Sequence, residues 1–304
     1  MGTPDFAVPS LKKLIDNFNV VGVVTQTDKP RGRGNTVLPT PIKKVALEYG
    51  IDVYQPQTFK DLAFDEQLKA IDPDVIAVVA YGKLLPEYVL NYPRLGCVNV
   101  HGSLLPKYRG AAPMQRAIID GCETTGITTM LMAKGLDTGD MLEKREISIL
   151  IDDNFEDVHD KLSEIGAELL LSTIIKLNNN EIVPQKQDDS LATHADKIEK
   201  ADCKIDFNKN AKTIHDQIRG LSPIPVAFCY HNGKLLKITR SALSDRSCRG
   251  AVPGQVISLE KGAICVACAD RAIDILGVVP EGKGKMKALD YINGRKISVG
   301  DILS

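Results

Sequence analysis

The chain has 304 residues, of which 43% are hydrophobic and 25% are charged, and these values favour a soluble globular protein of two domains. No apolar run reaches the roughly 20 residues that span a bilayer, and the first residues lack a secretory signal pattern, so we expect neither a membrane partner nor secretion. The net charge of −1 hides +6 over residues 195–304 and −7 over 1–194, which favours an anionic partner such as nucleic acid for the last third over a chance excess of solvated lysines.

Apolar runs and helical repeats alternate along the first part of the chain. In chain order they predict a strand at 20–26, a helix at 39–50, strands at 74–82 and 96–100, a helix at 112–121, strands at 125–132 and 140–149, and a helix at 154–177. Near-continuous apolar strands between helices are typical of a parallel sheet with helices on both faces. We therefore expect an α/β fold with a doubly wound, mostly parallel sheet over residues 1–178.

The character of the sequence changes after residue 178. Residues 179–200 are polar and lack periodicity, which predicts a linker between two domains. Beyond it, short apolar runs alternate with turn residues, and Asn232-Gly233 has the composition of a hairpin turn. Several short strands with tight turns predict a small, OB-like β-barrel over residues 201–304.

The seven cysteines are scattered and odd in number. Such a set argues against a disulfide framework and favours a reducing cytoplasm, of bacterial type or in an organelle of such origin. The one close pair, Cys265 and Cys268, has no second pair or histidine near it in sequence, so we expect no metal site.

Residues 99–113, NVHGSLLPKYRGAAP, follow a buried strand and contain the first candidate site. Asn99 and His101 are two residues apart, so on a strand they point to the same side, at the carboxyl end where α/β sheets bind ligands. The amide offers a neutral N–H donor and the imidazole can carry a proton near neutral pH. Together they suit acyl transfer, although an Asn-x-His pair is also common as a purely structural feature.

A carboxylate would complete such a site. The turn GLDTGDM supplies two, Asp137 and Asp140. Either one facing His101 would favour the imidazolium or join a proton relay, and spacing alone does not choose between them.

Several motifs, taken together, resemble one known family. They are GTPDFAVPSL, QTDKPRGRG, VVAYGKLLP, NVHGSLLPKYRGAAP and GLDTGDM in the first part of the chain, and DKIEKADCKIDF and GKMKALDYINGRKISVGDIL in the last part. The resemblance is to the methionyl-tRNA formyltransferases, within the folate-dependent formyltransferases, and it covers nearly the whole chain. It implies a Rossmann-like catalytic domain and a C-terminal tRNA-binding domain.

The resemblance also implies a reaction and its residues. The formyl group of 10-formyltetrahydrofolate passes to the amino group of methionine on initiator tRNA, and Asn99, His101 and Asp137 match the catalytic residues of the family. Asn99 and protonated His101 would stabilise the formyl oxygen, and Asp137, preferred to Asp140 only by this resemblance, would hold His101 and relay a proton.

The substrate-binding residues follow in the same way. The match to the family's folate-binding turn comprises Ser103, Leu104, Leu105 and Pro106, with Tyr81, Gly82 and Leu84 as further lining residues. The basic loop contributes Lys29, Arg31 and Arg33, and Arg33 is the residue that the resemblance places in the tRNA acceptor arm. Further tRNA contacts in the C-terminal domain are expected from Lys204, Lys209, Lys212, Lys234, Lys237, Arg240, Arg295 and Lys296.

Two departures from the family leave alternatives open. The family usually has a short apolar strand before GTPDF, which leads us to expect either a misassigned start or a truncation, and Ile224 stands where the family has tryptophan. One alternative is a formyltransferase for a small amine, such as a nucleotide-linked amino sugar. Another is a non-catalytic tRNA-binding relic. For the methionyl-tRNA formyltransferase that the resemblance implies, we expect a monomer.

Overall fold

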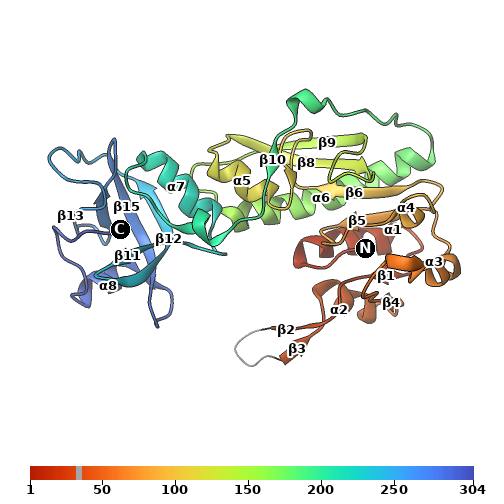
Figure 1. Cartoon of the computed structure of the whole chain (residues 1–304), viewed down its shortest axis with the longest axis horizontal. Coiled ribbons are helices and arrows are strands. Elements are labelled where there is room, and N and C mark those ends of the chain that lie inside the picture. Colours follow the sequence, from red (N-terminus) through yellow and green to blue (C-terminus); the bar gives the residue numbers. More distant parts are fainter. Residues whose placement is uncertain (32–35) are drawn as a thin grey trace. The chain divides into compact units, whose positions relative to one another are not determined.

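The computed structural model describes residues 1–31 and 36–304 (Figure 1). Contacts divide the chain into two compact units, each with a hydrophobic core. The N-terminal unit comprises Met1–Gly110, Gly126–Ile147 and His159–His194, and the C-terminal unit comprises Ala111–Thr125, Ser148–Val158 and Ala195–Ser304. Within the described part of the chain, no helix combines the length and the apolar character needed to cross a membrane.

The centre of the N-terminal unit is a sheet in two pieces. Strands β1 and β4 form a parallel pair, and four further strands follow in the order β5, β6, β8 and β9. Their bounds are Val23–Val24 for β1, Val53–Tyr54 for β4, Ile76–Val79 for β5, Cys97–His101 for β6, Thr124–Leu131 for β8 and Met141–Ser148 for β9. Strand β6 pairs in parallel with β5 and antiparallel with β8. The predicted Rossmann-like α/β fold is confirmed, and its parallel pairs lie in the part of the sheet that precedes β8.

Met1 and Gly2 lie between the two pieces of this sheet. The Met1 α-amino group donates a hydrogen bond to the Ala77 carbonyl at 2.6 Å, and the Gly2 N–H donates to the Val24 carbonyl at 3.0 Å. Gly2 also forms a parallel bridge with Val79, and a Cβ at position 2 would come within 2.9 Å of the Val79 carbonyl oxygen. Glycine therefore allows the backbone approach that links β1 to β5.

Helices flank the sheet. They are α1 Val8–Asn17, α2 Pro41–Glu48, α3 Asp65–Ile71, α4 Glu87–Leu90 and α6 Phe155–Asn178, with 3₁₀ turns at Asp5–Ala7 and Lys60–Leu62. Helix α2 begins with Pro41 in its first turn, and the Thr40 hydroxyl caps it by accepting the Lys43 N–H at 3.2 Å. Helix α6 packs against β6, where a Cβ on Gly166 would lie 3.0 Å from Cγ1 of Val100. Val100 therefore faces α6.

The C-terminal unit contains an antiparallel sheet that curls into a half-barrel, which is the form in which the predicted barrel occurs (Figure 1). The strand order is β11, β12, β15, β14 and β13, with β16 paired to β15. The bounds are Ala227–His231 for β11, Lys234–Leu243 for β12, Val256–Ser258 for β13, Ile264–Ala267 for β14, Ala272–Pro280 for β15 and Met286–Lys287 for β16. Asn232 and Gly233 join β11 to β12 with φ of 51° and 75°, as a two-residue hairpin turn requires.

Helices complete this unit. They are α5 Pro113–Ile119, α7 Ala211–Gly220 and α8 Ala288–Asn293, and the remaining short elements of the chain are β2 Lys29–Arg31, β3 Thr36–Leu38, β7 Arg109–Gly110, β10 His194–Ala195 and the 3₁₀ turns Asp189–Leu191 and Lys200–Cys203. Ile214 and Ile218 lie one turn apart on α7 and join Leu236 and Ile238 of β12 in the core. The unit therefore closes one face of its sheet with an amphipathic helix.

Candidate active site

Strand β6 presents Asn99 and His101 on the face of the sheet opposite α6. Because side chains alternate along a strand and Val100 faces the helix, both neighbours of Val100 point the other way. Asn99 is partly exposed, while His101 is 5% exposed. Within the described residues, no hydrogen bond to the Asn99 amide is formed, so its N–H donors are available to a ligand.

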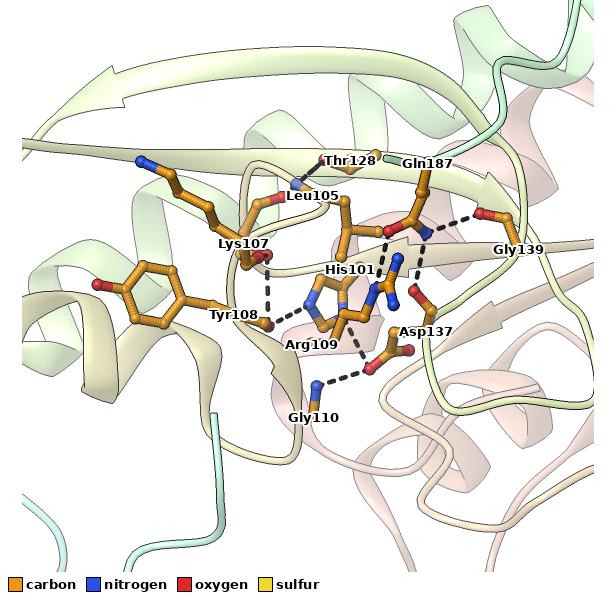
Figure 2. A network of polar contacts seen from close by, with 11 residues as sticks. His101, Leu105, Lys107, Tyr108, Arg109, Gly110, Thr128, Asp137, Gly139 and Gln187 are labelled. Carbon is orange, nitrogen blue, oxygen red and sulfur yellow. Dashed lines mark hydrogen bonds and ion pairs between the residues drawn. The ribbon is translucent and has the colours of Figure 1, made fainter. Parts of the chain in front are cut away.

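The two ring nitrogens of His101 have different partners (Figure 2). Nε2 lies 2.8 Å from the Tyr108 carbonyl oxygen, which can only accept, so Nε2 carries a hydrogen and donates it. Nδ1 lies 3.5 Å from Oδ2 of Asp137, whose side chain is 13% exposed. The two ring nitrogens therefore face a carbonyl and a carboxylate, and these two partners define the orientation of the ring.

Asp137, rather than Asp140, supplies the carboxylate that faces the histidine. Its Oδ2 also accepts the Gly110 N–H at 2.9 Å, and its backbone has φ of 53°. Asp140 instead contributes its backbone carbonyl to the Leu131 N–H at 2.9 Å. The structure thus brings together two of the predicted residues that are 36 positions apart in sequence.

The turn from Ser103 to Pro106 follows β6 directly and is held by side chains. The Thr128 hydroxyl accepts the Leu105 N–H at 3.0 Å and donates to the Ser103 carbonyl at 2.7 Å. The Lys144 ammonium donates to the Leu105 carbonyl at 2.5 Å. Ser103 and Leu105 are buried, whereas Leu104 and Pro106 are partly exposed. Only these last two of the four predicted residues present side chains to solvent.

The segment at 81–84, predicted as a further part of the folate pocket, likewise contains one buried and one exposed side chain. Tyr81 is 2% exposed, and burial raises the pKa of its phenol to about 12. Among the described residues its hydroxyl has no hydrogen-bond partner. Leu84, in contrast, is 75% exposed.

Two residues that the sequence did not single out form a chain of hydrogen bonds that leads to Asp137. Gln187 donates through Nε2 to the carbonyls of Asp137 and Gly139, and Arg109 donates through Nε to Gln187 (Figure 2). Gln187 lies 50 residues from Asp137 and 78 from Arg109. It falls in the polar stretch that reads as a linker, so no local pattern marked it.

Two of the predicted tRNA-binding residues, Lys29 and Arg31, belong to β2, which pairs antiparallel with β3 in a short ribbon. Lys29 is exposed, and its ammonium donates to Oε1 of Gln26 at 3.3 Å. Arg31 is the last residue of β2. Arg33 lies outside the described residues.

Metal ligation has no support in the residues described. Within 1–31 and 36–304, no group of three or more His, Cys, Asp and Glu side chains is arranged to hold an ion. The chemistry available at the site is therefore that of an amide donor, an imidazole and a carboxylate.

Comparison with known proteins adds a family to this geometry. A profile described as Formyl transferase matches residues 2–174, and one described as Formyl transferase, C-terminal domain matches residues 197–296. The methionyl-tRNA formyltransferase of Caldanaerobacter subterraneus subsp. tengcongensis is 48% identical, over 100% of this chain and 98% of that protein. The methionyl-tRNA formyltransferase of Clostridium novyi is 47% identical over the same shares of the two chains, 100% and 98%.

Solved structures share the fold. The N-formyltransferase from Helicobacter canadensis, in complex with folinic acid and dTDP-3-aminofucose, has a TM-score of 0.67 at 20% identity and covers 90% of this chain and 96% of its own. The methionyl-tRNA formyltransferase from Clostridium thermocellum has a TM-score of 0.53 at 21% identity, over 80% of this chain and 92% of its own. At such identities the likeness concerns the fold alone.

Proposed function

The chain belongs to the formyl transferase family, and from this premise we propose that it moves the formyl group of 10-formyltetrahydrofolate to the amino group of methionyl initiator tRNA. The observation that carries the proposal is the identity of 47–48% to methionyl-tRNA formyltransferases over the whole chain, both units included. The chain is thus a formyl-transferring enzyme, in line with the acyl-transfer chemistry of Asn99 and His101.

The proposed chemistry balances without a metal. The amine nitrogen forms a bond to the formyl carbon, the bond from that carbon to N10 of the folate breaks, and one proton passes in net from the amine to N10. Negative charge gathers on the formyl oxygen during this exchange. An unpaired amide N–H, as on Asn99, suits that oxygen, and loss of one such donor typically costs about 10²–10³ in rate.

His101 and Asp137 are proposed as the acid–base pair. The carboxylate 3.5 Å from Nδ1 favours the imidazolium, which places positive charge beside the reacting oxygen. The imidazolium donates a proton to the departing nitrogen, and the proton lost by the attacking amine returns to the imidazole through water and Asp137. Since Nε2–H is held by the Tyr108 carbonyl, the ring keeps one orientation throughout.

The folate is proposed to bind along the turn from Ser103 to Pro106. A flat pteridine requires apolar side chains on its faces and fixed backbone groups at its edge. The partly exposed Leu104 and Pro106 provide the first, and the contacts of Thr128 and Lys144 keep the turn in one conformation.

The tRNA is proposed to contact both the basic loop and the C-terminal unit. Lys29, Arg31 and Arg33 offer cations for phosphates of the acceptor arm. We assign residues 1–178 to catalysis, 201–304 to tRNA binding and 179–200 to the connecting segment, from which Gln187 contacts the Asp137 loop. The net charge of +6 over residues 195–304 supports the assignment to tRNA binding.

Several cations of the C-terminal unit line one cavity. A cavity of about 850 Å³ in this unit is lined by Arg240, Lys261, Lys285 and Lys287 on strands and loops of the half-barrel, together with acidic residues of the 152–157 segment. Of these cations only Arg240 was among the predicted ones.

We propose a monomeric, cytoplasmic enzyme, in keeping with seven cysteines that are all free.

A formyl-transfer assay on charged initiator tRNA tests the proposal. We expect turnover with 10-formyltetrahydrofolate and a loss of about 10³–10⁴-fold on His101→Asn. Two further arms measure tRNA binding without turnover and formylation of a nucleotide-linked amino sugar. Binding without turnover would identify a relic, and turnover of the sugar alone would identify a small-amine enzyme; either result contradicts the proposal.

A further inference from the structure

Gln187 is the one residue whose side chain donates hydrogen bonds to backbone carbonyls of the Asp137 loop, residues 137–139, among the bonds described for residues 1–31 and 36–304. Its Nε2 donates to the Asp137 carbonyl at 2.8 Å and to the Gly139 carbonyl at 2.7 Å. The side chain is 6% exposed. Both hydrogens of one buried amide thus hold two carbonyls of a three-residue segment.

The backbone of this segment has an unfavourable φ at Asp137 and close packing at Gly139, which the two hydrogen bonds help to maintain. Asp137 has φ of 53°, in the left-handed region that non-glycine residues enter only at an energetic cost. Gly139 packs so tightly against β8 that an added Cβ would lie 1.8 Å from the Leu131 carbonyl oxygen. The loop therefore has one backbone path, and the Gln187 amide stabilises it at the residue whose carboxylate faces His101.

Arg109 fixes which way the Gln187 amide points. Its Nε donates to Oε1 of Gln187 at 3.0 Å, and because guanidinium only donates, the amide oxygen must face it. The two N–H groups are then left for the two carbonyls. Arg109 is 6% exposed and its Nη2 is bound by Oδ1 of Asp189 at 2.7 Å, so the guanidinium itself is held in place.

The residues on either side of Arg109 complete the arrangement (Figure 2). The Tyr108 carbonyl accepts from His101 and the Gly110 N–H donates to Asp137. A shift of Arg109 would therefore move both members of the acid–base pair.

We propose that Gln187, oriented by Arg109, is a positioning residue for formyl transfer: it holds the Asp137 loop so that the carboxylate stays against Nδ1 of His101. This inference deepens the proposed function and rests on it. Gln187 touches no reacting atom, so its effect passes entirely through Asp137.

Two substitutions separate the amide donors from the rest of the side chain. Gln187→Glu keeps an acceptor for Arg109 but turns an oxygen toward the two carbonyls, and Gln187→Leu removes every hydrogen bond. We expect both to lower kcat about 10–100-fold with KM for folate and tRNA within about twofold, because only placement of the acid–base pair changes. Gln185→Leu is the matched control: its side chain is exposed two residues away, and we expect kcat to stay unchanged.

Combination with Asp137→Asn shows whether the effect passes through that carboxylate. The double variant Gln187→Glu/Asp137→Asn should be no slower than Asp137→Asn alone, since residues that act as a unit are not additive. A full further loss in the double variant, or a wild-type kcat in Gln187→Glu, would overturn the proposal.

A spectroscopic arm is independent of turnover. The chain has five histidines, so ¹⁵N spectra of their side chains in the full-length protein resolve His101 by comparison with His101→Asn. In Gln187→Glu we expect the Nδ1 resonance of His101 to move while the other histidines stay in place. An unmoved His101 signal would refute the positioning role even where activity is lost, whereas a moved signal in a protein without formyl transfer would uphold positioning and remove the proposed function.

Discussion

Two of the three buried histidines, His101 in the N-terminal unit and His215 in the C-terminal unit, use the same anchor and differ in what faces the other nitrogen. His101 donates Nε2–H to the Tyr108 carbonyl, and His215 on α7 places Nε2 2.9 Å from the Ile151 carbonyl. Nδ1 of His101 meets the Asp137 carboxylate, whereas Nδ1 of His215 lies 3.0 Å from the Ser241 hydroxyl. A carbonyl anchor alone makes an orienting contact, and at His101 a carboxylate also faces the second ring nitrogen.

The surroundings of His215 extend this contrast. Desolvation lowers the pKa of His215 foremost; the hydrogen bond to the Ile151 carbonyl opposes this, and the nearby Arg219 cation lowers the pKa further. The charges there pair with each other instead: Arg219 donates through Nε to Oδ1 of Asp216 at 2.8 Å, with side chains 6% and 3% exposed. The C-terminal network thus joins α7 to the 150–153 segment through neutral or mutually compensated groups.

Replacing His101 should have the largest effect. His101→Asn removes the proton carrier and its positive charge, and we expect kcat to fall about 10³–10⁴-fold. The corresponding His215→Asn should leave kcat within about threefold, measured below the unfolding temperature of each variant. Equal losses of kcat in the two variants would contradict the assignment of a catalytic role to His101 and a structural one to His215.

Breaking the C-terminal ion pair should come next, and in stability rather than rate. Arg219→Met leaves the Asp216 carboxylate and the carbonyls of Leu150 and Asp153 without their buried donor, at a cost of about 3–5 kcal/mol in the free energy of unfolding. Urea unfolding measures this cost. The matched control is Lys212→Met, which touches the same carboxylate from a side chain that is 50% exposed and should cost at most about 1 kcal/mol.

The carboxylate that distinguishes the two sites is tested directly by Asp137→Asn. The amide keeps an acceptor for the Gly110 N–H but no negative charge for the imidazolium, so we expect kcat to fall about 10²-fold with little change in KM. Asp140→Asn should change kcat by less than about threefold. A larger loss at Asp140 would move the acid–base role to that residue.

The smallest effect concerns pH. Since the folded pKa of His215 lies below its ordinary value of 6.5, the unfolded chain binds its proton more readily, and the stabilising contribution is present above pH 6.5 and declines as the pH falls below it. We expect Tm to drop between pH 7.5 and 5.5 by a few degrees more in the wild type than in His215→Gln. Parallel Tm curves for the two proteins would show that His215 contributes nothing to the pH dependence.

Much of the fold could be predicted because hydrophobic periodicity and turn residues encode it locally. The helix predicted at 39–50 is α2 at Pro41–Glu48, and the one predicted at 154–177 is α6 at Phe155–Asn178. The strand predicted at 20–26 is only Val23–Val24, since pairing with β4 ends there. The antiparallel entry of β8 beside β6 depends on non-local pairing, which no periodicity reports.

In the site too, the residues placed by local spacing could be predicted and those placed by distant contacts could not. Asn99 and His101 share a face because of strand alternation, so two residues of spacing sufficed to pair them. The choice of Asp137 over Asp140 came from family resemblance, because both lie in one turn. Gln187 and Arg109 escaped detection since their contacts join positions 50 and 78 residues apart and Gln187 stands in a polar, aperiodic stretch.

Backbone groups make two of the hydrogen bonds that orient the acid–base pair. His101 is held by the carbonyl of Tyr108 and Asp137 by the N–H of Gly110, so replacement of the Tyr108 side chain does not by itself delete either bond. Proline at 110 would remove the hydrogen bond from the Gly110 N–H to Asp137. A single-residue insertion or deletion between His101 and Gly110 would place other peptide groups opposite the imidazole and the carboxylate. The site therefore depends on the number of residues between His101 and Gly110 more than on the side chain at position 108. The loop is accordingly poorly suited to carry an engineered insertion.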